Sequence, residues 1–169
     1  MRKRPEYCPD CGTRLSETPF EGRPRRFCVK CGVPIYENPL PATCVVAVNN
    51  DGDFLITKRA VEPGRGKWSL PGGFMEIDET PEECALRELF EETGLTADVI
   101  AHLGAEGQTS RKYINVMVAG FLVRADGEPR AGDDVSDARW FKPFEVPELV
   151  FSSHRKIFAR AIDLIEEMS

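Results

Sequence analysis

The chain has 169 residues, of which 41% are hydrophobic and 30% are charged, and its formal net charge at pH 7 is −6. This length suits one modest domain with a small appendage. No apolar stretch approaches the ~20 residues that span a bilayer, which excludes a membrane-spanning helix. The basic N-terminus has no apolar segment behind it and does not read as a secretory signal. We therefore expect a cytoplasmic protein without a membrane partner.

The charge is unevenly distributed. Residues 1–31 carry eight Lys and Arg against four Asp and Glu, whereas the other residues carry fourteen against twenty-four. An acidic body disfavours nonspecific nucleic-acid binding through the main domain. It still suits an anionic substrate if bound cations reverse the local field. We expect no nucleic-acid partner for the body, while the basic N-terminal segment leaves a contact there open.

The N-terminal segment contains two CxxC pairs, each followed by glycine: Cys8 with Cys11, and Cys28 with Cys31. Four thiolates in tetrahedral geometry are what structural Zn²⁺ prefers. Free or disulfide-linked cysteines are the alternative, which the lack of a secretory signal disfavours. Since all four ligands come from the protein, we expect a structural zinc that provides most of the folding energy of a small ribbon.

The chain divides by composition into a ribbon at residues 1–35 and a larger domain at 36–169. Residues 33–41 contain three prolines, which predicts a linker without regular structure. Two β-rich runs come next, Cys44–Val48 and Phe54–Thr57, separated by the turn residues 49–52. Trp68–Leu70 is a further short strand candidate.

The clearest predicted helix begins after Thr80. Thr80 and Glu83 form a capping box around Pro81, and Gly94 supplies a C-terminal stop. The remaining expected elements are strands at Val99–Leu103, Tyr113–Val123 and Ala138–Phe141, and an amphipathic helix at Ser153–Glu167. This irregular alternation predicts a mixed α/β sandwich.

Three glutamates share one side of that helix. Glu88, Glu91 and Glu92 lie at i, i+3 and i+4. A solvated, salt-bridged face is the alternative interpretation, but the loop 70–76 brings backbone carbonyls beside the acids. Hard oxygen ligands of this kind suit Mg²⁺ or Mn²⁺. On the opposite face and its flank, apolar side chains are expected to dock the helix on the core: Leu86, Leu89 and Phe90.

These residues resemble a complete Nudix box. Its fixed positions are filled by Gly73, Glu79, Arg87, Glu88, Glu91, Glu92 and Gly94. The resemblance implies an α/β/α sandwich with a mixed sheet and metal-dependent hydrolysis of a nucleoside diphosphate linked to another group. It makes the three helix glutamates and the Gly73 carbonyl metal ligands, with Glu88 or Glu91 as general base. Arg87 and Glu79 would organise loop and helix.

Further site residues are expected nearby. Similar proteins place an acid in a downstream loop, and residues 131–137 offer three, of which we favour Asp134; an acidic solvent loop is the alternative. Candidates for substrate contact are Arg59, Trp68, Phe74 and Tyr113, each of which also suits packing or surface. Arg111 and Lys112 are further phosphate candidates.

The residues downstream of the box narrow the substrate. Residues 104–113 lack the Ser-Gln-Pro-Trp-Pro-Phe motif of similar NADH pyrophosphatases, and they lack a proline that many ADP-ribose pyrophosphatases have there. FAD, ADP-ribose or a nucleotide sugar is therefore favoured over NADH. A nucleotide sensor without catalysis and an RNA-cap-removing hydrolase that uses the basic ribbon are the alternatives. Dimers are common among similar proteins, and the residues leave monomer or homodimer open.

Overall fold

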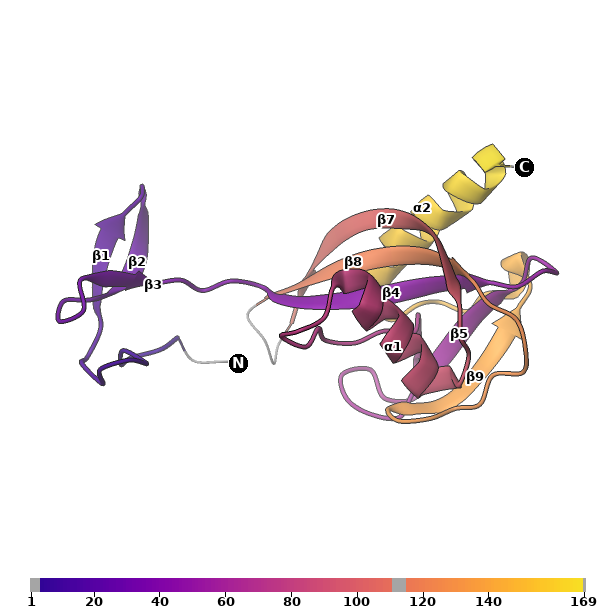
Figure 1. The fold of residues 1–169 in the computed structure, drawn as a ribbon, viewed down its shortest axis with the longest axis horizontal. Coiled ribbons are helices and arrows are strands. Elements are labelled where there is room, and N and C mark those ends of the chain that lie inside the picture. Colours follow the sequence, from indigo (N-terminus) through magenta and orange to yellow (C-terminus); the bar gives the residue numbers. More distant parts are fainter. Residues whose placement is uncertain (1–3, 111–114, 169) are drawn as a thin grey trace.

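The computed structural model describes residues 4–110 and 115–168 and contains two sheets (Figure 1). The small N-terminal sheet has the order β1-β2-β3 and is antiparallel. Its strands are β1 (Ser16–Phe20), β2 (Arg23–Cys28) and β3 (Val33–Ile35). The linker expected over 33–41 is wrong at both ends, because β3 and the next strand reduce it to residues 36–39. Pro34 is tolerated because β3 is an edge strand that pairs only with β2.

The large sheet has six strands in the order β6-β5-β4-β8-β7, with β9 paired to β5. Strands β4 and β8 pair in parallel and the other pairs are antiparallel, so the sheet is mixed. The strands are β4 (Leu40–Val48), β5 (Phe54–Arg59), β6 (Trp68–Ser69), β7 (Asp98–Thr109), β8 (Asn115–Arg124) and β9 (Val135–Phe141). Between β9 and the last helix lies a 3-10 turn, η1 (Pro143–Glu145).

Strand β7 extends six residues beyond the expected end at Leu103. The continuation contains Gly104 and Gly107 and lacks the apolar alternation by which strands are recognised. It forms by long-range pairing with β8, and the register shifts between His102 and Ala105. Gly104 lies at this irregularity with a φ of 79°.

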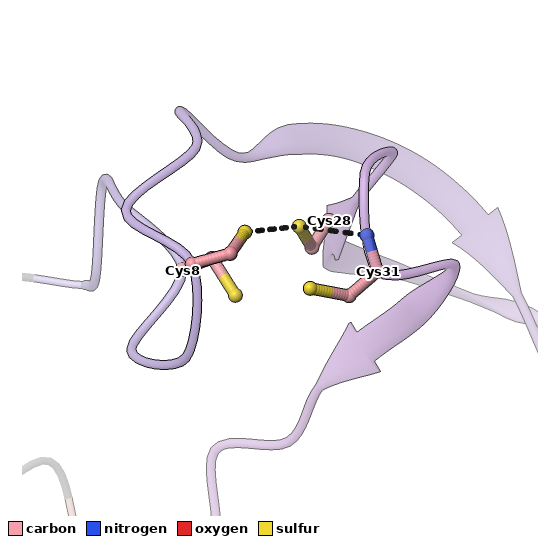
Figure 2. Close-up of side chains that lie close together, drawn as sticks. Cys8, Cys28 and Cys31 are labelled. Atoms are coloured by element: carbon pink, nitrogen blue, oxygen red, sulfur yellow. Dashed lines mark hydrogen bonds between the residues drawn. The ribbon is translucent and has the colours of Figure 1, made fainter.

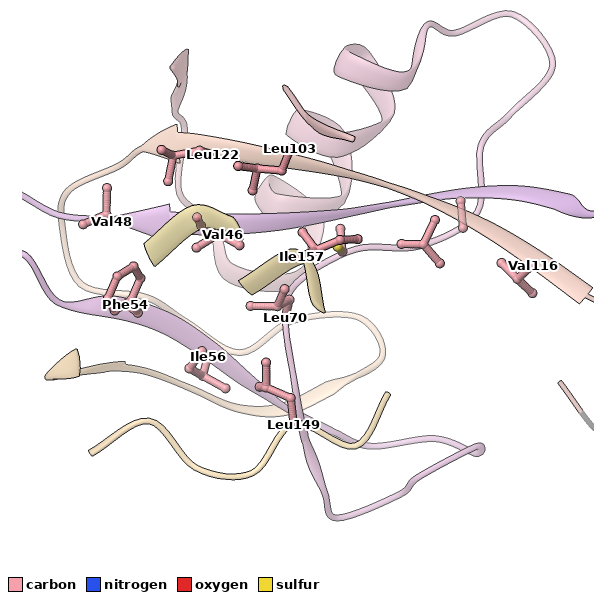
Figure 3. Close-up of a cluster of buried hydrophobic side chains, with 14 residues drawn as sticks. Val46, Val48, Phe54, Ile56, Leu70, Leu103, Val116, Leu122, Leu149 and Ile157 are labelled. Atoms are coloured by element: carbon pink, nitrogen blue, oxygen red, sulfur yellow. The ribbon is translucent and has the colours of Figure 1, made fainter. Parts of the chain in front are cut away.

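Two helices cover opposite faces of the large sheet (Figure 1). Helix α1 (Pro81–Thr93) packs with Ala85 and Leu89 against one face, and α2 (Ser152–Met168) packs with Ile157 and Ala161 against the other. Figure 3 shows the core on the α2 side. A Cβ at Gly120 would lie 2.3 Å from Ile157 Cγ2, so this glycine in β8 allows α2 to approach closely.

The central strand β4 is buried on both faces. Cys44 and Val46 belong to the core beneath α2, whereas Val45 and Ala47 belong to the core beneath α1. A strand with this pattern is covered by helices on both sides, as the expected α/β/α sandwich requires. Within the described ranges, neither helix has the length and apolar character needed to cross a membrane.

Candidate active site

Helix α1 begins and ends as its sequence predicts. The Thr80 hydroxyl accepts a hydrogen bond from the Glu83 amide at 3.2 Å, and the Glu83 carboxylate accepts one from the Thr80 amide at 2.7 Å. Gly94 adopts a φ of 72°, and its amide donates to the Phe90 carbonyl. Phe90 was expected to dock on the core, but its side chain is 55% exposed. Leu89 is fully buried and provides that contact.

Arg87 connects several backbone and side-chain groups of the site. Its Nε and Nη2 donate to the two Glu79 oxygens at 2.9 and 2.7 Å, a bidentate pair. Its Nη1 donates to Glu88 at 2.8 Å and to Glu91 at 2.9 Å, and Nη2 also reaches the Phe74 carbonyl at 3.2 Å. This guanidinium lowers the pKa of Glu79 to about 2, so that carboxylate stays ionised.

The loop before α1 approaches both β4 and the helix closely. A Cβ at Gly72 would lie 2.2 Å from the Thr43 carbonyl oxygen, and one at Gly73 would lie 2.5 Å from the Glu88 carboxylate. Gly72 also has a φ of 146°. Only glycine fits these two positions without displacing either the strand or the acid. The double glycine thus sets the distance between the loop and Glu88.

Glu92 is the most buried acid of the site, with 4% of its surface exposed. Its Oε2 accepts a hydrogen bond from the Gly72 amide at 3.1 Å. Burial raises the pKa of Glu92 to about 8, with a further contribution from the negative charges of Glu88 and Asp133. Burial also raises the pKa of Glu88. Buried acids with raised pKa values beside an ion-pair network are typical of functional sites.

The loop between β8 and β9 lies against the end of α1. The Arg130 amide donates to the Thr93 carbonyl at 2.8 Å, and the Gly132 amide donates to the Glu92 carbonyl at 3.0 Å. A Cβ at Gly132 would lie 2.6 Å from the Glu91 carbonyl oxygen. These contacts satisfy helix carbonyls that lack intrahelical partners. They also bring Asp133 toward the acids.

The charge of Asp133 raises the pKa of both Glu88 and Glu92. Asp133 has a φ of 44°, and the Asp134 carbonyl accepts a hydrogen bond from the Ala60 amide. The sequence offered both residues and favoured Asp134. Gly132 packs closely on α1, and this contact directs the course of the loop. No local sequence pattern predicts it.

The substrate candidates occupy different surroundings. Arg59 donates from Nε to the Pro63 carbonyl at 2.7 Å, and its positive charge acts on Glu92. Trp68 packs edge-on against Phe141 with ring centroids 5.2 Å apart, which is a packing environment. Phe74 is 41% exposed beside the Arg87 contact. Tyr113, with Arg111 and Lys112, lies outside the described residues.

Among the described residues, the three helix carboxylates do not converge to the spacing of the ligands of one metal ion. Within the described residues, the four cysteines of the ribbon are the only group of three or more His, Cys, Asp or Glu side chains whose ligand atoms all lie within 4.8 Å of one another. The Gly73 carbonyl accepts a hydrogen bond from the Thr43 amide at 2.9 Å. A metal ligand from this loop would therefore be either the Gly73 carbonyl oxygen, which also accepts the Thr43 hydrogen bond, or the neighbouring Gly72 carbonyl oxygen.

The four cysteines converge from two similar turns (Figure 2). The Gly12 amide donates to the Cys8 carbonyl and the Gly32 amide donates to the Cys28 carbonyl, and both glycines have a positive φ. All four thiols are free of disulfides, and the Cys11 and Cys28 sulfurs lie 3.5 Å apart. Hydrogen bonds to Thr13 lower the pKa of Cys11 to about 6, which favours its thiolate. This cluster can hold a soft metal ion.

Comparison with known proteins identifies the larger part of the chain. Residues 38–161 match the NUDIX domain model. An ADP-ribose pyrophosphatase of Methanocaldococcus jannaschii is 38% identical over 120 residues, which cover 69% of this chain and 70% of that protein. The chain belongs to the Nudix family. It is therefore placed among hydrolases, and the predicted fold class is confirmed.

Two further relatives are similar to this Nudix protein over the ribbon as well as the main domain. A Nudix hydrolase structure from Nitrosomonas europaea superposes with a TM-score of 0.80 at 27% identity, covering 96% of this chain and 93% of that one. The NAD-capped RNA hydrolase NudC of Vibrio atlanticus is 28% identical over all of this chain. The chain spans only 62% of the length of that relative.

Proposed function

We propose that this Nudix protein hydrolyses the diphosphate linkage of a nucleoside diphosphate derivative, with ADP-ribose as the leading substrate. The arrangement around Arg87 carries the proposal, because one guanidinium contacts Glu79, Glu88 and Glu91 together. Such an arrangement fixes acids that would otherwise repel one another. The relative named as an ADP-ribose pyrophosphatase supports this choice of substrate.

The proposed Mg²⁺ or Mn²⁺ site combines the carboxylates of Glu88, Glu91 and Glu92 with a carbonyl of the double-glycine loop. These oxygen donors fit a hard divalent cation. We further propose Asp133, in place of Asp134, as the acid from the β8–β9 loop, because its charge acts on two of the glutamates. When bound, the cation supplies charge neutralisation at the pyrophosphate and a more acidic water.

The protein groups then have separate roles in the proposal. Glu88 or Glu91 accepts the proton of the attacking water, and both acids are oriented by Arg87. Glu92 is kept in place by the Gly72 amide at 3.1 Å. Glu79 holds Arg87 and also accepts a hydrogen bond from the Glu76 amide, so it acts as a positioning residue. Arg59 is the best placed candidate for a phosphate contact because its charge reaches Glu92.

A substrate panel tests the proposal. ADP-ribose, FAD, NADH, a nucleotide sugar and oxidised dGTP are each incubated with the full chain and Mg²⁺ or Mn²⁺, and the products are separated by chromatography. We expect metal-dependent release of AMP from ADP-ribose at the highest rate. Binding of ADP-ribose without any turnover of the panel would instead favour the sensor alternative.

A second candidate is the hydrolysis of an NAD-linked substrate, including NAD-capped RNA. The match to the NAD-capped RNA hydrolase favours it, since that alignment covers the whole chain and includes the ribbon. Residues 104–113 of the sequence nevertheless lack the motif expected for NADH enzymes. Faster cleavage of an NAD-capped RNA than of free NADH or ADP-ribose would favour this second candidate.

We also propose that the cysteine cluster holds a structural Zn²⁺ and that the chain divides at residue 35. The two equivalent turns and the four thiolate donors support this. Free thiols at Cys44 and Cys84 suit a cytoplasmic location, where thiols stay reduced. Mass spectrometry of the native protein tests the zinc content, with one Zn²⁺ per chain as the expected result.

A further inference from the structure

One face of the small N-terminal sheet carries aromatic and basic side chains, and the strand residues on it include no acidic one. The register of β1 and β2 places Thr18 opposite Arg25 and Phe20 opposite Arg23. Directly paired residues lie on the same face, and alternate residues of a strand share it. We call this side the ribbon face and define it by the residues Ser16, Thr18, Phe20, Arg23, Arg25, Phe27, Pro34 and Tyr36.

The ribbon face points away from the cysteine cluster. Cys28 alternates with Phe27 along β2 and belongs to the small core with Cys8 and Leu15. Ile35 packs on that same core. One side of the sheet therefore carries the proposed zinc site, and the side chains of the ribbon face do not contribute to that site.

The rings and guanidinium groups of the ribbon face contact one another. The Arg25 guanidinium lies 4.6 Å above the centre of the Tyr36 ring, and the rings of Phe20 and Phe27 are 5.9 Å apart. Tyr36 is 50% exposed. Glu21, in the turn after β1, lies at the edge of the face and contacts Arg25 at 3.6 Å. Its carboxylate also accepts a hydrogen bond from the Tyr36 hydroxyl.

Arg25 retains hydrogen-bonding capacity in this setting. Its contact to Glu21 uses Nη2, while its Nε is buried. A guanidinium has five N–H donors, and 25% of the Arg25 side chain is exposed, so the donors on Nη1 and Nη2 are the ones that a phosphate or the edge of a base would meet. Arg23, at the end of the same row, is exposed.

We propose that the ribbon face binds single-stranded nucleic acid. Exposed and half-buried rings offer stacking surfaces to unpaired bases, and neighbouring arginines neutralise phosphates. The charge distribution favours this location, because residues 1–31 carry an excess of Lys and Arg while the body is strongly acidic. A duplex presents no free base faces, so the chemistry of this face selects single strands.

The test is fluorescence anisotropy of the full metal-loaded chain with a labelled single strand of about 12 nucleotides. RNA and DNA strands are compared with a duplex of the same sequence and with polyglutamate as competitor, at about 50 and 200 mM salt. We expect both single strands to bind, a weaker duplex complex and no competition by polyglutamate. The RNA and DNA arms show which strand the face prefers.

Variants assign the binding to the face. Tyr36→Leu and Arg25→Gln should each weaken single-strand binding by about fivefold or more, as for the loss of one stacked base or one phosphate contact. Tyr36→Phe should retain binding. Arg26→Gln is the matched control, since Arg26 lies on the other side of the same strand and the charge change is equal.

Metal content and the exposure of the cysteines to a thiol reagent verify that each variant keeps its ribbon. Absence of single-strand binding by the wild type at tens of micromolar, as non-specific affinities allow, would overturn the proposal. So would equal losses in Arg26→Gln and Arg25→Gln, or full binding by Tyr36→Leu, since the surface would then act only as diffuse charge.

Discussion

At the residue scale, Arg87 shows why a motif position is restricted to one amino acid. It donates to three carboxylates and one carbonyl with distances between 2.7 and 3.2 Å. Only a planar group with five donors can satisfy such a set, whereas an ammonium is a single point charge. A lysine has three N–H donors, so it would lose at least two of these five contacts.

Arg87→Lys should therefore lose activity while the fold persists. Glu88 and Glu91 would shift by about an ångström, which costs on the order of 100-fold in turnover. Thermal unfolding should change little, because Arg87 is partly exposed at the surface of α1. Steady-state kinetics with ADP-ribose and calorimetry provide the two measurements. Turnover within a factor of two of wild type would contradict the positioning role.

At the level of elements, Gly72 and Gly73 allow the loop to pack closely beside α1. A larger residue would have a different effect at each of the two positions. At Gly72 the clash is with the backbone of β4, which cannot move without disturbing the sheet. At Gly73 the clash is with the Glu88 carboxylate, the end of a flexible side chain. The first position is thus coupled to the fold and the second to the site.

Gly72→Ala should lower stability strongly, and Gly73→Ala should mainly lower activity. The first change forces a left-handed φ and a backbone clash, whereas the second displaces one carboxylate. Urea unfolding and turnover measured on both variants separate the effects. If Gly73→Ala unfolds as readily as Gly72→Ala, the assignment of these two roles is wrong.

Helix α2 and strand β6 meet at a buried histidine. The Leu70 amide donates to His154 Nδ1 at 3.2 Å, so this nitrogen must be unprotonated. Burial, with the nearby charge of Arg59, lowers the pKa of His154 to about 3 from 6.5. The folded state consequently binds fewer protons than the unfolded state between these two values, and stability falls as the pH drops below 6.5.

His154→Asn keeps an acceptor for Leu70 and removes this titration. Wild type should lose up to about 1.4 kcal/mol of unfolding free energy per pH unit below 6.5 from this group, and the variant should not. Trp68 and Trp140 report unfolding of the main domain in urea between pH 5 and 7.5. The same slope in both proteins would refute the role of His154.

Elements that begin and end at capping or turn residues could be predicted from the sequence. Segments that form by pairing with a distant part of the chain could not. The Thr80–Glu83 capping box and Gly94 define α1 without reference to the rest of the chain. The continuation of β7 depends on β8, and the docking of Gly132 on α1 depends on a tertiary contact. The effect of the Asp133 charge on Glu88 and Glu92 depends on that same contact, for which the loop carries no local signal.

At the scale of the whole molecule, the two sheets differ in the size of their apolar cores, and the proposed zinc would make up the difference in the ribbon. The large sheet has a core on each face, whereas the ribbon has only a small cluster around Cys8, Leu15 and Cys28. A bound structural zinc provides on the order of 10 kcal/mol or more in such small modules. The box residues identified the larger part from sequence, while the ribbon face became visible only through the strand register.

Removal of the metal with a strong chelator should unfold the ribbon alone. Both tryptophans lie in the main domain, so its fluorescence-detected unfolding should remain unchanged. Trypsin should then cut after Arg25 and Arg26, whose backbone is paired in the sheet while the ribbon is folded. Mass spectrometry of the fragments reads this out. A tryptophan transition that shifts with the metal would show that the two parts do not fold independently.

The turnover of Glu92→Gln tests most directly whether the carboxylates of α1 hold a divalent cation for diphosphate hydrolysis. Glutamine has nearly the same shape and its oxygen can still accept the Gly72 amide bond, but it carries no charge for a metal ion. We predict a turnover of ADP-ribose that is lower by orders of magnitude at saturating Mg²⁺, with a stability no lower than that of the wild type, because the variant no longer buries a carboxyl whose pKa is raised by burial. Equal turnover of the variant and the wild type would contradict the account.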